Sequence, residues 1–164
     1  MITEILNNKK EAIVRKWIDL ILNSYPAEAA NFLKLKKNQF GNPIGHTITI
    51  NAEKIYDELI NDCDFEKIKF LLDEIIKIRA VQSFSPSQAL GFLFDLKKTV
   101  RDEFSVELEK KAIPDELSKL DLLIDQIVLI GFDLYMGSRE KIFKIRVNEI
   151  KSRSYKAVET ASDL

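Results

Sequence analysis

The feature that most restricts the fold of this chain is a segment from Pro114 to about Ser152 that contains no proline after its first residue. Proline suits the first turn of a helix, and the acidic pair Asp115-Glu116 that follows it favours a helix start. Apolar positions then recur in steps of three and four, at Leu117, Leu120, Ile124, Ile127, Gly131 and Leu134. This spacing predicts one helix, roughly 58 Å long at about 1.5 Å per residue.

Such a helix is longer than the body it belongs to. A compact domain of 164 residues has a diameter of roughly 40 Å, so about four turns should protrude. The protruding part, residues 139–156, carries seven basic and two acidic residues but keeps Ile142, Ile145 and Ile150. Helices with an exposed apolar seam usually pair with another helix, so we expect a homodimer with these isoleucines as contacts. A frayed, solvated tail is the alternative.

The rest of the chain shows helical spacing of its apolar residues and little turn chemistry, with only five Gly and four Pro. Ser85-Pro86-Ser87-Gln88 forms a capping box, and Asp62 or Asp64 can cap the preceding helix. We expect a single all-α domain over residues 1–164, with about six helices, the last two long, and residues 139–164 protruding. The other helices are predicted at residues 2–23, 26–37, 49–61, 62–78 and 86–104, with a glycine-rich loop over 38–49.

Composition excludes several functional classes. The net charge of −1 provides no field for nucleic acid or an anionic membrane. The start of the chain has no signal-peptide pattern, and its most apolar stretch, residues 122–136, is interrupted by Asp125, Gln126 and Asp133. The lone Cys63 excludes an internal disulfide and fits a reducing compartment. We therefore expect a cytoplasmic protein with no nucleic-acid partner and no membrane insertion.

Residues for catalysis or metal binding are sparse. His46 is the only histidine and lies in the predicted loop, without the partners that a metal, haem or nucleophilic site requires. Acids next to Cys63 should raise its pKa, and this disfavours a reactive thiolate. Asp121 and Asp125 are spaced i, i+4, but they lack the Glu-x-x-His pattern of bundle metal sites and are interpreted as a solvated face. We expect no catalytic residues, no metal and no cofactor.

Arg79 is the charged residue of greatest interest. It follows Ile75 by four positions on an apolar helix, just before a turn. A half-buried guanidinium there needs carbonyl or carboxylate partners, which makes a structural clamp the favoured interpretation. A contact to an anionic ligand or a signalling contact is the alternative.

Several motifs resemble a known family, the N-terminal domains of RsbR/RsbRD-type proteins, which are RsbT co-antagonists of bacterial stressosomes. They are Tyr25-Pro26, the run from Phe40 to Gly45, the run from Ile78 to Ala89, the run from Phe132 to Tyr135, and Arg139-Glu140-Lys141-Ile142. The resemblance implies a non-enzymatic sensory domain, often dimeric, with a globin-like fold that lacks haem. Within these motifs, the candidate ligand or signalling contacts are Arg79, Gln82, Asn42, Asp133 and Tyr135.

Two functions remain open on this basis. One is a sensor that relays a ligand or partner signal through its last helix, and the other is a ligand-free dimerisation or docking module of a larger complex. Proteins of this kind usually carry a following STAS-type output domain with phosphorylated Ser or Thr. Because no such segment is present among these residues, we expect a stand-alone member and transfer no phosphorylation site.

The absence of a suitable histidine gives a first prediction. Purified protein supplied with haem should show no Soret band that depends on His46, because the predicted helices offer no axial ligand. Absorption spectra of the parent protein and of His46→Ala should be the same, and stoichiometric haem binding lost in His46→Ala would contradict the prediction.

Overall fold

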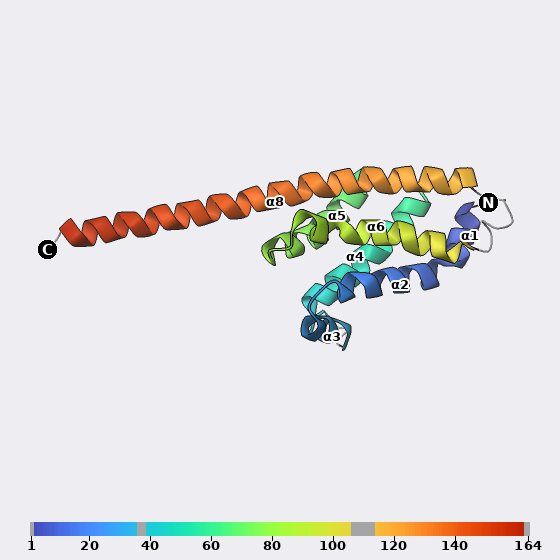
Figure 1. The fold of residues 1–164 in the computed structure, drawn as a ribbon, viewed down its shortest axis with the longest axis horizontal. Coiled ribbons are helices and arrows are strands. Elements are labelled where there is room, and N and C mark those ends of the chain that lie inside the picture. The colour runs from blue at the N-terminus through green and yellow to red at the C-terminus, as the bar shows by residue number, and fades with distance from the viewer. Residues whose placement is uncertain (1, 36–38, 106–113, 163–164) are drawn as a thin grey trace.

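The computed structural model describes residues 2–35, 39–105 and 114–162, and within them it contains helices and turns but no strand. The helices shown in Figure 1 are α1 Ile2–Asn8, α2 Lys10–Asn23, α3 Ala27–Leu35, α4 Pro43–Ile60, α5 Phe65–Val81, α6 Pro86–Glu103 and α8 Pro114–Ser162. The prediction of an all-α fold is confirmed.

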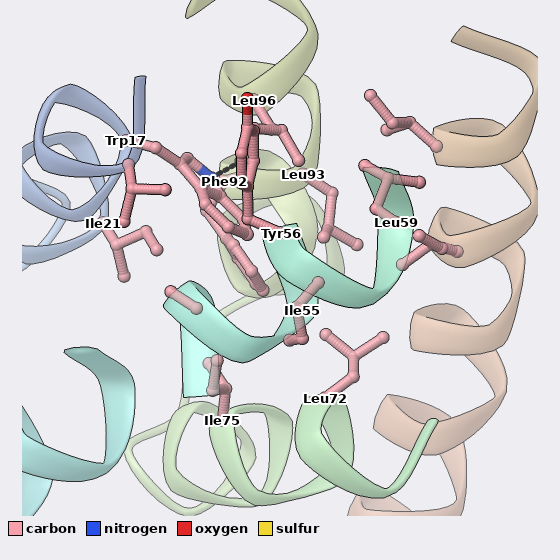
Figure 2. Close-up of a cluster of buried hydrophobic side chains, with 14 of the residues drawn as sticks. Trp17, Ile21, Ile55, Tyr56, Leu59, Leu72, Ile75, Phe92, Leu93 and Leu96 are labelled. Carbon is pink, nitrogen blue, oxygen red and sulfur yellow. Dashed lines mark hydrogen bonds between the residues drawn. The ribbon is translucent and has the colours of Figure 1, made fainter. Parts of the chain in front are cut away.

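The helices stack in layers, with α8 along one side of the molecule and α3 at the opposite side (Figure 1). Helix α8 packs on α5 and α6, while α4 packs on α5 and α2 packs on α6. The core between these layers is apolar and centred on Trp17, whose ring stacks on Phe92 at 6.1 Å between centroids (Figure 2). The Trp17 indole N–H also donates to the Phe92 carbonyl over 2.6 Å, which satisfies its one polar atom inside the core.

The two caps read from the sequence are present. The Asp64 side chain accepts from the backbone N–H groups of Glu66 and Lys67 at the start of α5. Ser85 accepts from the Gln88 backbone N–H, and the Gln88 side chain accepts from the Ser85 N–H, so the capping box opens α6. These caps fix where α5 and α6 begin.

The predicted glycine-rich loop is wrong over most of its length, because α4 begins at Pro43 rather than near residue 49. Asn42 is the cap: its side-chain oxygen accepts from the Gly45 N–H over 2.9 Å, and its amide donates to the Leu33 carbonyl over 2.6 Å. Pro43 occupies the first turn, where its missing N–H costs nothing. Local Gly and Pro therefore mark a helix start here rather than a loop.

One other helix boundary differs from expectation. The first predicted helix is divided at Lys9 into α1 and α2. Helix α3 ends at Leu35, while the predicted end at Lys37 and the loop start at Asn38 lie outside the described residues. The division at Lys9 leaves Leu6 of α1 and Ile13, Trp17 and Ile21 of α2 in the core.

Helix α8 is even longer than predicted. It spans 49 residues instead of ending near Ser152, which gives a length of roughly 74 Å. Its first half lies on the body, and its second half extends well beyond every other helix (Figure 1). From Asn148 to Ser162 every residue is exposed.

Gly45 provides a test of the Asn42 cap. A Cβ at position 45 would lie 2.2 Å from the Asn42 amide nitrogen, so Gly45→Ala must displace the capping side chain. We expect the free energy of unfolding to fall by about 1–3 kcal/mol. Gly91→Ala is the matched control, because a Cβ there meets nothing within 4 Å and should stabilise α6 by about 0.5–1 kcal/mol. Urea denaturation of both variants measures the difference, and equal stabilisation by both would contradict the proposed cap.

Candidate functional site

Arg79 lies in the last turn of α5 and is fully buried, with 0% of its surface exposed. One guanidinium nitrogen donates to the Gln88 carbonyl over 2.9 Å. The other donates to the Ile21 carbonyl over 3.2 Å and to the Ser24 hydroxyl over 2.8 Å. A single side chain thus joins the end of α2, the end of α5 and the first turn of α6.

Aromatic rings surround the same guanidinium. Its central carbon lies 5.2, 5.0 and 5.1 Å from the ring centroids of Tyr25, Phe84 and Phe92. No carboxylate in the described part of the chain forms an ion pair with Arg79, so ring faces and carbonyl oxygens hold the cation. Burial lowers the pKa of Arg79, and the Tyr25 and Asp95 side chains oppose that shift. The favoured interpretation of Arg79 as a clamp is consistent with this geometry.

The turn after Arg79 is fastened to α8. Ser83 adopts a φ of 63°, and the Phe84 N–H donates a hydrogen bond to the Arg79 carbonyl over 3.2 Å. The Tyr135 hydroxyl donates to the Phe84 carbonyl, and the Arg139 guanidinium donates to the Ala80 carbonyl over 2.9 Å. We name residues 79–88 together with Tyr135 and Arg139 the turn site. It lies where α8 leaves the body.

Two further ion pairs hold α8 against α6. Lys97 contacts Asp125 over 2.5 Å, and Arg101 contacts Asp121. The interpretation of this pair as a solvated face is wrong for Asp121, whose side chain is largely covered in its ion pair with Arg101, whereas Asp125 stays half exposed beside Lys97. Among the described residues, no group of three or more His, Cys, Asp and Glu side chains is arranged to hold a metal.

Helix α8 is apolar on two opposite faces. The face toward the body is buried and contains Leu117, Leu120, Ile124, Ile127, Gly131 and Tyr135. The opposite face carries residues exactly seven apart that are 40% to 68% exposed; we call it the outward seam, and its members are Leu122, Leu129, Met136, Phe143 and Ile150. Seven residues in a helix return to nearly the same angle, so the seam continues from the body into the protruding half.

The structure separates the predicted contact residues. Tyr135 belongs to the turn site and is buried, and Arg79 is closed off from solvent. Asn42 is buried in the cap of α4. Gln82, at the end of α5, and Asp133, on α8, are exposed. Sequence reasoning thus identified three members of the turn site, Arg79, Gln82 and Tyr135, while the roles of Phe84 and Ser24 were missed.

The three isoleucines predicted as dimer contacts do not share one face. Ile142 is half-buried and packs against the core. Ile145 and Ile150 are exposed, but five residues turn a helix by about 140°, so only Ile150 lies on the outward seam. The exposed Phe143, which the prediction omitted, lies on the seam seven residues, or about two turns, before Ile150.

A groove that the sequence analysis missed runs between α2, α3 and α4. Its volume is about 830 Å³, within the range of small-molecule sites. Its apolar wall contains Val14, Ile18, Leu22, Leu33 and Ile50, and its rim includes Arg15 and His46. The signal in the sequence was a second apolar row on α2, at positions 14, 18 and 22, beside the row that contains Trp17.

Cys63 follows the end of α4 with a φ of 49°. Burial raises the pKa of its thiol, and the nearby Glu58 raises it further. The expected direction is confirmed, although burial and Glu58, rather than the adjacent acids, cause the shift.

The described residues form an all-α domain in which the turn site joins the ends of three helices to α8. The family model described as "RsbT co-antagonist protein rsbRD N-terminal domain" matches residues 11–150. The chain therefore belongs to this family, as its motifs indicated.

A protein from Archaeoglobus fulgidus, described as an uncharacterized protein, is 24% identical over 147 residues, which cover 85% of this chain and 83% of that protein. No solved structure matches the chain significantly, so the globin-like arrangement stays a prediction. Within the described ranges, no helix combines the length and apolar character needed to cross a membrane.

The turn site yields a stability prediction. Arg79→Ala removes the donors to the Ile21 and Gln88 carbonyls and leaves a cavity among three rings, so the free energy of unfolding should fall by about 3–5 kcal/mol. Arg79→Lys should recover only part of this loss, because an ammonium cannot reach both carbonyls as a planar fork does. Arg15→Ala, on an exposed arginine of α2, should change the value by less than about 0.5 kcal/mol.

Denaturation midpoints of the three variants test this prediction. Equal midpoints for Arg79→Ala and Arg15→Ala would show that the buried guanidinium contributes nothing to stability.

Proposed function

We propose that this chain is a non-enzymatic sensory module in which the body receives a ligand or partner signal and α8 transmits it. The observation that carries the proposal is the form of α8: it is fastened to the body at the turn site and then leaves the body with an exposed apolar seam. Membership of the family of RsbT co-antagonist N-terminal domains supports a regulatory role.

The input side of the proposal rests on the groove between α2, α3 and α4. Its apolar wall and charged rim resemble the lining of ligand sites, which combine mostly apolar walls with a few polar groups. The turn site and the groove also share α2, because Leu22 lines the groove while the neighbouring Ile21 carbonyl accepts from Arg79.

The output side of the proposal is self-association through the outward seam. Five large apolar side chains exposed at intervals of seven residues would lower solubility unless another surface covers them. A second copy of the chain offers a matching seam, and two-fold dimers are the commonest closed assembly. Phe132 and Val147 lie beside the seam and would widen the apolar contact.

The alternative function is a ligand-free dimerisation or docking module, which would use the same seam and leave the groove empty. Native mass spectrometry of the purified protein separates the two. A stoichiometric small molecule that is released on unfolding supports the sensor, whereas a protein of unliganded mass in every oligomer supports the docking module.

A double substitution on the seam tests the dimer. Phe143→Asp with Ile150→Asp places two charges in the proposed contact and should make the protein monomeric at tens of micromolar, because buried unpaired carboxylates are costly. Asn148→Asp with Ser152→Asp adds the same charge to exposed positions on the other side of α8, and this control should remain dimeric. Sedimentation equilibrium measures both; a monomeric parent protein would refute the dimer, and a dimeric seam variant would place the interface elsewhere.

A further inference from the structure

The groove between α2, α3 and α4 lies along two antiparallel helices. At one end, the Lys10 ammonium of α2 contacts Glu53 and Asp57 of α4 over 3.6 and 2.7 Å. At the other end, α3 follows α2 in the chain and holds the start of α4, because the Asn42 amide donates to the Leu33 carbonyl. The start of α2 thus lies beside the end of α4, and this orders the lining residues along both helices.

Three polar side chains of the lining lie close together along the groove. Arg15 follows Lys10 by five residues, or about 7.5 Å along α2. On α4, Thr49 precedes Glu53 by four residues, or about 6 Å, so Arg15 and Thr49 lie nearly level. His46 lines the groove one turn before Thr49. Arg15 is exposed, whereas Thr49 and His46 are half-buried.

These side chains carry donors that the described fold does not use. Within residues 2–35, 39–105 and 114–162, Arg15, Thr49 and His46 make no hydrogen bond or ion pair. The contrast is clearest for Thr49, because the hydroxyls of Thr99 and Thr160 each donate to the carbonyl four residues earlier in their helices. A guanidinium, a hydroxyl and an imidazole therefore offer N–H and O–H groups to one ligand.

The charges of the lining favour an anion beside Arg15. The other two cations, Lys10 and Lys34, have carboxylate oxygens at 2.7 and 3.9 Å. Arg15 is the one cation of the lining without such a pair among the described residues. The acid Glu11 also lacks a pair, but it lies one turn before Arg15, towards the start of α2. An anion on the other side of Arg15 is therefore attracted by an unpaired charge.

The wall on that other side is apolar. Ile18 and Leu22 follow Arg15 on α2, and Leu33 of α3 lies at the same end of the groove. Arg15 and Leu22 are seven residues apart, or about 10 Å along the helix. An extended chain covers about 1.2 Å per bond, so an acyl chain of roughly eight to ten carbons spans this wall.

We propose that the groove binds an apolar carboxylic acid, whose carboxylate contacts Arg15 and Thr49 and whose chain lies over Ile18 and Leu22. This inference rests on the proposed input role of the groove and adds the chemical class of its ligand. A guanidinium binds a carboxylate through two parallel N–H···O bonds. The apolar wall contributes in proportion to the area that the chain covers.

Three ligands with the same straight chain test the proposal: decanoate, decan-1-ol and decyltrimethylammonium. Isothermal titration calorimetry at neutral pH, below the concentrations at which these ligands form micelles, measures their dissociation constants. The constant for decanoate should be at least about tenfold lower than that for the alcohol, because charge-assisted hydrogen bonds are stronger than neutral ones. The cationic ligand should bind most weakly of the three.

Substitutions locate the carboxylate. Arg15→Gln should raise the dissociation constant of decanoate about tenfold and leave that of decan-1-ol unchanged. Thr49→Val keeps the shape of the side chain and should weaken decanoate several-fold. Arg153→Gln is the matched control, because it removes the same charge from the exposed, protruding half of α8 and should change neither constant.

The outcomes separate this proposal from the proposed function. Equal affinities for decanoate and decan-1-ol, tighter binding of the cationic ligand, or equal decanoate affinities in Arg15→Gln and Arg153→Gln would overturn the carboxylate while leaving a ligand site in the groove. No binding of decanoate also overturns the proposal. Native mass spectrometry then decides on the sensor: a retained small molecule keeps the input role with another ligand class, whereas an unliganded mass removes that role.

Discussion

The rest of the structure depends on a buried guanidinium that has no acidic partner in the described residues. Removing a cation from water costs several kcal/mol even after relaxation, and Arg79 recovers that cost only where carbonyls and ring faces converge. The ends of α2, α5 and α6 must therefore meet at one point, with the Ile21 and Gln88 carbonyls and the Phe84 ring all in place. A partial arrangement would leave the charge buried and unsatisfied, so this contact selects one packing of three helices.

Sequence reasoning was most successful where the determinants are local. The Ser85 box, the Asp64 cap and the proline-free run after Pro114 depend on neighbours a few residues away, and they located α5, α6 and α8. It failed at the start of α4, because the Asn42 side chain is held partly by the Leu33 carbonyl from a different helix. The groove was missed for a related reason: the spacing of Val14 and Leu22 shows an apolar row but not which helix lies opposite.

The turn site was only partly predictable. A lone arginine on an apolar helix points to a clamp, and family resemblance points to Tyr135, but their partners are backbone carbonyls that carry no sequence signal. The dimer contacts show another limit. Ile142, Ile145 and Ile150 look equivalent in a list of apolar residues, yet helical angle and the extent of the body decide that the first packs inward while only the last joins the seam.

The two sides of the proposed function meet in α2. One face of α2 lines the groove with Val14, Ile18 and Leu22. In the last turn of the same helix, the Ile21 carbonyl accepts a hydrogen bond from Arg79. The residue after Arg79, Ala80, accepts from Arg139 of α8. A ligand that shifts the end of α2 must therefore either strain the Arg79 contacts or carry the α5–α6 turn with it. Because packed cores favour discrete arrangements over gradual deformation, the turn is the element through which such a shift would reach α8.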